Sequence, residues 1–194
     1  MTSGEQAYLA MPRLRLQDRD LSLRAVQPAD IESIRQWRNA QMDVLRQTSV
    51  ISPEAQQRYF AEHVWPQKDK LHPKQILLAI ERSGELIGYG GLVHISWPDL
   101  RAEVSFLLAP TIELQHHLRS EIFANTLRLL QEFAFLDLSL LRLWTETYSN
   151  RIRHIHTLES VGFQLEGRLR NHVVMGNIFL DSLIHGSLSH QWRK

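Results

Sequence analysis

Two glutamates and a tyrosine in this protein could exchange protons with a substrate. Glu103 lies in the strand predicted over 102–108, on the side opposite to the apolar residues of that strand. Glu146 and Tyr148 occupy alternate positions in the strand predicted over 141–148. A carboxylate held near a substrate can accept a proton, and a phenol can donate one. An alternative interpretation is that the two carboxylates belong to an exposed polar face.

The composition excludes several other kinds of catalytic site. The chain has no cysteine, which excludes disulfides, thiolate metal sites and a cysteine nucleophile. It has ten histidines, but His154 and His156 are two residues apart on a predicted helix and therefore point in different directions. His116 and His117 are adjacent, and neither pair has the spacing of a zinc site. We therefore expect no metal.

Length and charge predict a single domain that binds neither nucleic acid nor membrane. The 194 residues carry 22 basic and 21 acidic side chains, without the basic excess of a nucleic-acid-binding surface. No run approaches the roughly 18 apolar residues that a membrane-spanning helix needs, and the N-terminus lacks the apolar core of a signal peptide. We expect a leader over residues 1–20, one domain over 21–190 and a cytoplasmic location.

The residues from 138 to 163 combine a strand, a polar turn and a helix. The side-chain oxygens of Ser149 and Asn150 offer capping acceptors for the first N–H groups of the helix. Gly162 stands where a helix C-terminus favours a residue with positive φ. The apolar stripe of the helix consists of Ile152, Ile155 and Leu158.

The rest of the chain alternates strands with helices. This order predicts an α/β (α+β) fold, with a mixed sheet that carries helices on both faces. Three glycines in one predicted strand, Gly88, Gly90 and Gly91, indicate a bulge or a close approach of backbones. The other predicted segments are strands over 21–27, 75–81, 85–95, 163–175 and 178–188, and helices over 28–37, 52–65 and 118–135.

A series of residues in the second half of the chain forms a family pattern. It consists of Asn150, Leu158-Glu159, Gly162-Phe163, Glu166-Gly167-Arg168-Leu169-Arg170 and Asp181-Ser182. The pattern resembles the GNAT superfamily of acetyl-CoA-dependent N-acetyltransferases. Within it, the branch of ribosomal-protein N-terminal acetyltransferases and nucleotide-amino-sugar N-acetyltransferases is most similar. The resemblance covers roughly residues 21–188 and implies a mostly antiparallel sheet of about seven strands.

The resemblance implies an enzyme that moves the acetyl group of acetyl-CoA to a primary amine by direct attack. The implied acceptor is a small molecule or a peptide, either a nucleotide-linked amino sugar or a protein N-terminus. An alternative is a non-catalytic relative that senses acyl-CoA or binds a partner protein. A homodimer is also possible, with Trp65, Trp97 and Trp192 at the contact.

The resemblance places the pyrophosphate of the cofactor at the turn before the central helix, where helix N–H groups bind anions. The segment is Gln115-His116-His117-Leu118-Arg119-Ser120. The family usually has two glycines here, and in either register of the pattern both are replaced. Backbone N–H groups of Phe106, Leu107 and Leu108 would polarise the thioester carbonyl. Asn150 matches the cofactor-contacting asparagine of the family.

By the same resemblance, Glu103 is the first candidate for the general base and Glu146 the second. Many relatives have a tyrosine as general acid at the position of Leu158, so this acid is missing here. Tyr148 is the nearest replacement. The residues implied to bind the acceptor are Trp37, Arg38, Asn39 and Asp181.

Overall fold

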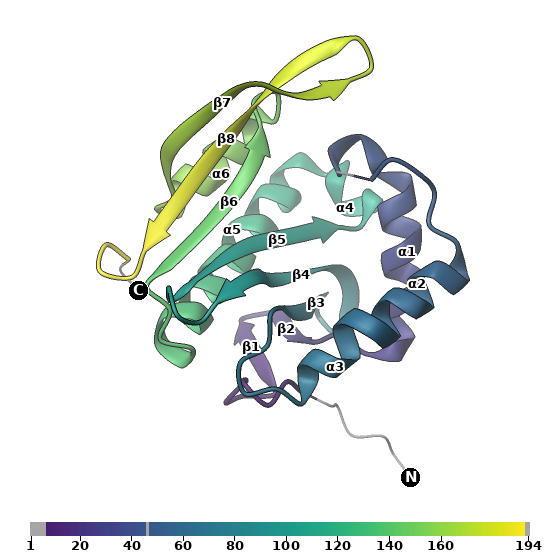
Figure 1. Ribbon diagram of the computed structural model, residues 1–194, viewed down its shortest axis with the longest axis vertical. Coiled ribbons are helices and arrows are strands. Elements are labelled where there is room, and N and C mark those ends of the chain that lie inside the picture. The colour runs from purple at the N-terminus through teal and green to yellow at the C-terminus, as the bar shows by residue number, and fades with distance from the viewer. Residues whose placement is uncertain (1–6, 46, 193–194) are drawn as a thin grey trace.

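The computed structural model, which describes residues 7–45 and 47–192, contains one eight-stranded sheet in the order β1-β2-β3-β4-β5-β6-β8-β7 (Figure 1). All neighbouring strands are antiparallel except β5 and β6, which are parallel. The predicted fold class is confirmed, with one strand more than the resemblance implied. The strands are β1 (Arg15–Asp18), β2 (Leu21–Ala25), β3 (Ile76–Arg82), β4 (Glu85–Ser96), β5 (Arg101–Leu108), β6 (Arg142–Tyr148), β7 (Gln164–Met175) and β8 (Ile178–Leu188).

The additional strand, β1, lies inside the segment expected as a leader. It pairs antiparallel with β2, and its Leu16 is buried in the core. Tyr8 is 1% exposed, and its hydroxyl accepts the backbone N–H of Leu77 at 3.0 Å. Packed structure therefore begins before the expected boundary at residue 21. Residues 1–6 of the expected leader lie outside the described residues.

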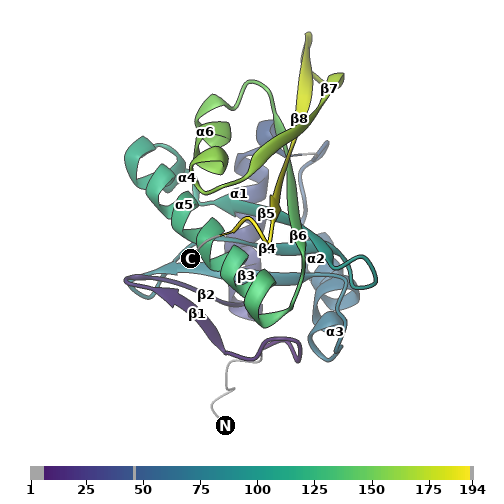
Figure 2. The same cartoon turned by 90° about the vertical axis from the view of Figure 1, so that its left-hand side faces the viewer.

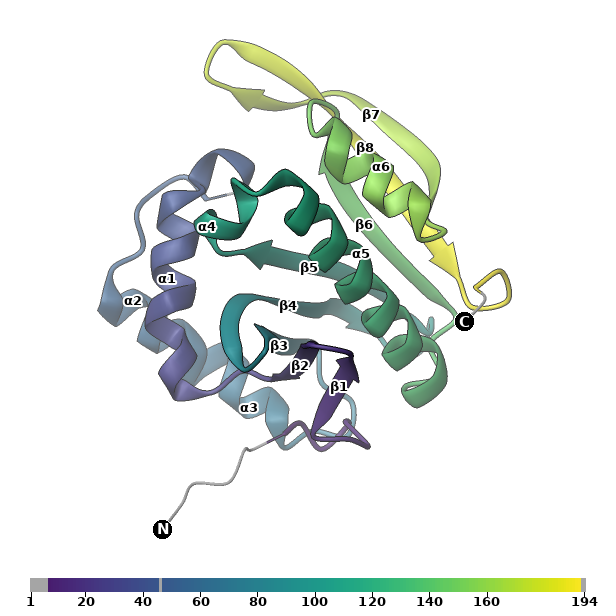
Figure 3. The same ribbon diagram turned by 180° about the vertical axis from the view of Figure 1, so that it is seen from behind.

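Helices cover both faces of the sheet (Figures 2 and 3). One hydrophobic core contains Phe123 and Leu127 of α5, and the other contains Ile34 of α1 and Phe60. Strand β3 contributes to both cores, and for this reason its sequence is apolar at consecutive positions. The helices are α1 (Ile31–Ala40), α2 (Pro53–Tyr59), α3 (Trp65–Lys68), α4 (Pro110–Glu113), α5 (His116–Glu132) and α6 (Ile152–Ser160), with 3₁₀ turns η1 (Pro28–Asp30) and η2 (Met42–Val44) and π turns η3 (Phe60–Val64) and η4 (Phe133–Asp137).

The predicted helix ends have different outcomes. The start of α2 is confirmed, because the Ser52 hydroxyl accepts the backbone N–H of Ala55 at 3.2 Å. The predicted end at Trp65-Pro66 is wrong. The chain continues through η3 into α3, where Pro66 occupies the first turn. The expected cap by Ser149-Asn150 is also wrong, because the N-cap of α6 is Arg151 and it makes no side-chain capping bond.

The glycines of β4 allow close contact between strands, as expected. A Cβ atom at Gly90 would lie 2.6 Å from the carbonyl oxygen of Ser105 on β5. Gly91 has a φ of +132°, and a Cβ atom there would clash with the backbone of β3. The register between β4 and β5 shifts after Val93, which leaves His94 in a bulge with a φ of +49°. Bulges of this kind redirect a side chain, here toward the surface that contains Glu103.

The parallel strands β5 and β6 separate soon after they pair. They are paired only over Arg101–Glu103 and Arg142–Trp144. Beyond these residues the two strands diverge like the arms of a V (Figure 1). The β5 backbone over 104–108 therefore has no strand neighbour on the side of β6. At the open end, the Gln41 side chain donates a hydrogen bond to the carbonyl of Leu108 at 2.9 Å.

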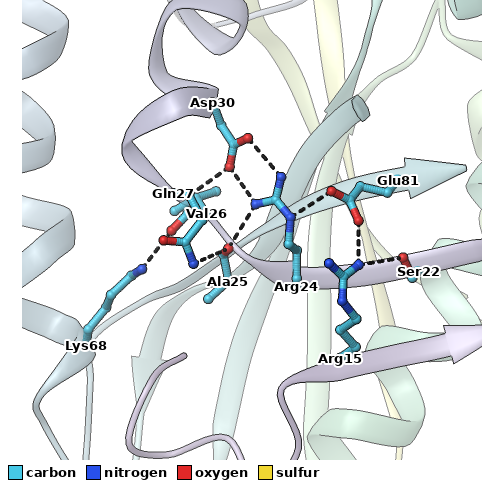
Figure 4. A network of polar contacts seen from close by, with 9 residues as sticks. All are labelled: Arg15, Ser22, Arg24, Ala25, Val26, Gln27, Asp30, Lys68 and Glu81. Carbon is cyan, nitrogen blue, oxygen red and sulfur yellow. Dashed lines mark hydrogen bonds and ion pairs between the residues drawn. The ribbon is translucent and has the colours of Figure 1, made fainter. Parts of the chain in front are cut away.

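A charge network joins the first three strands to the start of α1 (Figure 4). Arg24 of β2 donates two hydrogen bonds to Asp30, at 2.7 and 2.9 Å, and one to Glu81 of β3 at 2.7 Å. Arg15 of β1 donates to the other oxygen of Glu81 at 2.5 Å. Hydrogen bonding by Asp30 raises the pKa of the Arg24 guanidinium. Because Arg24, Asp30 and Glu81 are buried, each charge depends on its partners for compensation.

Candidate active site

The divergence of β5 and β6 forms a cavity of about 270 Å³ that is lined by both strands. Glu103 lies opposite Trp144 in the parallel register, so their side chains share one face of the sheet. Alternation along β6 puts Glu146 and Tyr148 on the same face. The three side chains predicted from the sequence to exchange protons with a substrate are Glu103, Glu146 and Tyr148. All three therefore line one cavity.

Each carboxylate in this cavity lies near an imidazole of a neighbouring segment. Glu103 is 15% exposed at its side chain, and one oxygen lies 3.7 Å from Nε2 of His94 in the β4 bulge. Glu146 is 9% exposed at its side chain, and one oxygen lies 3.9 Å from Nε2 of His172 on β7. The cavity thus presents two largely buried carboxylates, one from each arm of the V, which suits a cationic or proton-donating group of a substrate.

A second cavity of about 410 Å³ lies beside the N-terminus of α5 and the turn before α6. His116, Arg119 and Asn150 line it. The first N–H groups of a helix have no intrahelical partner and attract anions. In α5 the N–H of Arg119 bonds to the carbonyl of Gln115, which leaves the N–H groups of residues 116–118 for a ligand. The two cavities meet, because both are lined by Val44, Arg151 and His154.

Two arginines give this junction positive charge. Arg119 is 6% exposed and bonds through Nε to Glu113 at 2.6 Å and through Nη2 to Nδ1 of His154 at 3.2 Å. Its Nη1 atom is buried, and among the described residues it has no hydrogen-bond partner. Burial, and then the charge of Arg119, lower the pKa of the Arg151 guanidinium. An anion in the second cavity would compensate the charge of Arg151 and accept a hydrogen bond from Nη1 of Arg119.

A third cavity of about 290 Å³ adjoins the first on the side of α1 and α2, and the two share Arg38, Val93 and Ser105. Its lining is largely apolar and aromatic, and the Arg38 guanidinium donates to the hydroxyl of Tyr89 at 2.8 Å. The other lining residues are Ile34, Ile51, Ala55, Gln56, Tyr59, Phe60, Gln75 and Leu77.

The three residues of the segment Trp37-Arg38-Asn39 were expected to bind the acceptor together, but they make different contacts. Arg38 lines the first and third cavities. Trp37 packs against both hydrophobic cores. Asn39 holds the following loop, because its side chain exchanges two hydrogen bonds with the backbone of Ile51, both at 2.9 Å. Asp181 lines none of these cavities and instead accepts hydrogen bonds from Arg168 and from the backbone of Asn171.

The predicted cofactor residues are only partly brought together. Phe106 and Leu107 line the first cavity, whereas the Leu108 carbonyl is used by Gln41. In the segment over 115–120, only His116 and Arg119 line the second cavity. Gln115 and His117 are exposed, and Leu118 and Ser120 are half-buried. Asn150 lines the second cavity, close to the N-terminus of α5.

Sequence reasoning missed Arg151, His154 and His94. The first two lie one and four residues after Asn150 and line both cavities, so the start of the helix after that asparagine was the available signal. For His94 the available signal was weaker and consisted of its position shortly after the glycines of β4. The tryptophans expected at a dimer contact are half-buried in the chain itself. Trp97 donates to the carbonyl of Pro73 at 2.8 Å, and Trp192 packs on Phe135.

A family model of the GNAT acetyltransferase domain matches residues 23–184 of this chain. The chain therefore belongs to the GNAT acetyltransferase family. It is an N-acetyltransferase that uses acetyl-CoA as co-substrate and acetylates an amine. The family match does not distinguish the branch, so the particular branch implied by the sequence stays a prediction. No curated protein sequence matches the chain.

Solved structures with the same fold include a spermidine N-acetyltransferase from Vibrio cholerae in complex with CoA and spermine. It has a TM-score of 0.78 and 19% identity, over 89% of this chain and 97% of the other. A dodecameric spermidine N-acetyltransferase from the same organism, in an intermediate state, has a TM-score of 0.73 and 19% identity, over 88% and 94% of the two chains. At this identity the likeness shows the fold alone.

The residues of the second cavity fit the pyrophosphate of acetyl-CoA despite the loss of both glycines. The free N–H groups of α5 and the unpartnered Nη1 of Arg119 are donors that an anion would satisfy. Within residues 7–45 and 47–192, no group of three or more His, Asp and Glu side chains is arranged to hold a metal. Over the same residues, no helix combines the length and apolarity that crossing a bilayer requires.

Proposed function

We propose that this enzyme acetylates the primary amine of a small molecule by direct attack of the amine on the thioester of acetyl-CoA. The observation that supports this best is the position of Glu103 and Glu146. They come from the two arms of the V and line one cavity, which meets the phosphate-binding cavity at Arg151 and His154. An amine held by the carboxylates would face a thioester that enters from the second cavity.

Each residue of the first cavity has a proposed role. Glu103 accepts the proton that the amine must lose, directly or through a water molecule. Glu146 holds the amine by a charge-assisted hydrogen bond before the reaction. The backbone N–H group of Phe106, on the unpaired edge of β5, polarises the thioester carbonyl, whereas the N–H group of Leu107 faces β4. Tyr148 remains a candidate donor to the leaving group.

The cofactor is proposed to lie across the second cavity. The N–H groups at the start of α5 and the Arg119 guanidinium bind its pyrophosphate, and Asn150 contacts the cofactor beside them. The other predicted residues of this segment would then act through their backbone and the helix dipole and would make no side-chain contact with the cofactor. They are Gln115, His117, Leu118 and Ser120.

The acceptor class is proposed from the third cavity. Its aromatic side chains Tyr59 and Tyr89 offer flat surfaces for a ring, and Arg38, which also lines the first cavity, offers a partner for a phosphate. A nucleotide-linked amino sugar carries a base, phosphates and a primary amine, and therefore suits these three features. A protein N-terminus is the second candidate, with its side chains in the third cavity.

Binding of acetyl-CoA, followed by thiol release with a panel of amines, tests the proposal. The panel contains a nucleotide-linked amino sugar, a peptide with a free N-terminus, and spermidine, the substrate named for the structural neighbours. We expect the fastest release with the amino sugar. If spermidine is preferred, the proposed acceptor is wrong. If acetyl-CoA binds but no amine supports release, direct transfer to an amine is wrong.

Matched variants test the two carboxylates. Glu103→Gln should lower kcat by about 10²- to 10⁴-fold, the range for loss of a general base. Glu146→Gln should mainly raise the KM for the amine, by about tenfold or more, since it removes one charge-assisted bond. Glu85→Gln, at the exposed first residue of β4, serves as the control for a change of charge. An unchanged kcat in the Glu103 variant removes it as the base.

A further inference from the structure

His154 lies at the junction of the two cavities that acetyl-CoA must bridge. It belongs to α6, is 6% exposed and lines both cavities. Its ring stacks on Phe106 of β5 with centroids 5.5 Å apart and an angle of 13° between the planes. The ring of Phe123 on α5 contacts it from another direction, at 4.3 Å. The imidazole is therefore held in one orientation beside the β5 edge.

The hydrogen bond from Arg119 fixes the tautomer of this ring. A guanidinium can only donate, and its Nη2 lies 3.2 Å from Nδ1 of His154. Nδ1 must therefore be the acceptor, so the neutral ring carries its proton on Nε2. In the described part of the chain, Arg119 is the hydrogen-bond partner of His154, which leaves the Nε2–H group to be used by a ligand.

The surroundings of the ring favour its neutral form. The charged and titratable groups that face it are Arg119 on α5, Arg151 before α6 and His185 on β8, and Glu113 reaches it only through Arg119. Burial, and then the charges of Arg151 and Arg119, hold the pKa of His154 well below its usual range. The ring is thus a fixed neutral donor rather than an acid that titrates near neutral pH.

We propose that His154 is a catalytic residue, whose Nε2–H donates a hydrogen bond to the thioester sulfur as the leaving group departs. In this step, which rests on the proposed function, the amine nitrogen forms a bond to the carbonyl carbon and its proton passes to Glu103. The carbon–sulfur bond breaks with both electrons on sulfur. The hydrogen bond from Nε2–H stabilises that negative charge, and the thiolate takes its proton from solvent after release.

The geometry favours His154 over Tyr148 for this role. Tyr148 lines the first cavity only. With the pyrophosphate in the second cavity and the acetyl group in the first, the thioester sulfur would lie where the two cavities meet, and His154 lines that junction. Leu158, one helical turn after His154, has a hydrocarbon side chain without a donor, and it is 1% exposed in the core. His154 is the imidazole that lines both cavities.

Three variants on one helix test the proposal. His154→Phe keeps the stacking on Phe106 and Phe123 but removes the donor. His154→Gln keeps an N–H near the position of Nε2. His156→Phe, on the exposed side of the same helix, controls for the substitution itself. We expect kcat of the Phe variant to fall by about 10²-fold, with the Kd of acetyl-CoA changed by less than about threefold by calorimetry, and the Gln variant to recover most of kcat.

The pH profile separates a neutral donor from other roles. The ratio of wild-type to His154→Phe kcat should stay constant between about pH 6.5 and 9, because a neutral ring does not titrate there. If this ratio of kcat values falls toward one as pH rises, the donor is a charged imidazolium and the proposal is overturned. Equal kcat in the two proteins would also overturn it, as would a loss in the Phe variant that appears only as weaker binding of acetyl-CoA.

Nitrogen-15 NMR of the wild-type histidines gives a test that needs no variant to fold. We expect the ring assigned to His154 to stay neutral with its proton on Nε2 below about pH 6.5, where exposed imidazoles become protonated, and we expect its Nε2 resonance to move when CoA is added. A ring with the proton on Nδ1, or an Nε2 resonance that CoA leaves in place, contradicts the proposal. A wild-type enzyme that releases no thiol with any amine would remove the proposed function as well, so the two failures are distinguishable.

Discussion

Replacing Arg151 by glutamine should stabilise the fold and weaken the binding of acetyl-CoA. Arg151 is half-buried between the two cavities, and its surroundings lower the pKa of its guanidinium, first through burial and then through the charge of Arg119. Glu113 and Asp43 attract it from a distance, but in the described residues it has no side-chain hydrogen bond or ion pair. The charge is therefore unfavourable until an anion binds.

The two effects have different sizes. Glutamine fills a similar volume without the charge, so the free energy of unfolding should rise by about 1 kcal/mol, typical of stabilising replacements at functional sites. For a domain of this size, the melting temperature should increase by about 2–4 °C. One charge-assisted bond to phosphate contributes about 1.5–3 kcal/mol, so the Kd for acetyl-CoA should rise about 10- to 150-fold.

Thermal unfolding without ligand and calorimetric titration with acetyl-CoA measure the two quantities on the same protein samples. Arg58→Gln, at an exposed position of α2, makes the same change of charge away from the site. It should change neither the melting temperature nor the Kd appreciably. A less stable Arg151→Gln protein that binds acetyl-CoA as tightly as the wild type would refute the reasoning, because Arg151 would then be a structural cation.

Two further predictions concern stability. Asp30→Asn leaves the buried guanidinium of Arg24 with one carboxylate partner fewer and should lower the free energy of unfolding by about 3–5 kcal/mol in urea titrations; a loss below about 1 kcal/mol would show that Glu81 alone compensates the charge. The second prediction concerns acid. Because the pKa of His154 is lowered in the fold, the unfolded chain binds one more proton below about pH 6.5, and stability should fall by up to about 1.4 kcal/mol per pH unit from this group. The His154→Phe variant should show a shallower loss between pH 6.5 and 5, and an equally steep loss would mean that other groups cause it.

Local sequence patterns predicted much of the sheet and one part of the site. Alternation along a strand depends only on backbone geometry, so it placed Glu146 and Tyr148 on one face before the structure was known. The two predicted strands on either side of Gly176-Asn177 and the close contacts of the β4 glycines follow from equally local rules. The strand β1 was missed, because its four residues carry a weak pattern and are stabilised by pairing with β2.

The sequence by itself determined most of the strands and helices, which of their faces are apolar and, through the family pattern, that this is an acetyltransferase. The tertiary structure decided which side chains share a cavity. Arg119 was expected at the pyrophosphate turn, but Glu113 and His154 hold its guanidinium at the junction between the cavities. Asp181 was expected at the acceptor, but Arg168 holds it on the terminal hairpin. The contact of Arg119 with His154 joins residues 35 positions apart in the chain, and no local periodicity encodes such a contact.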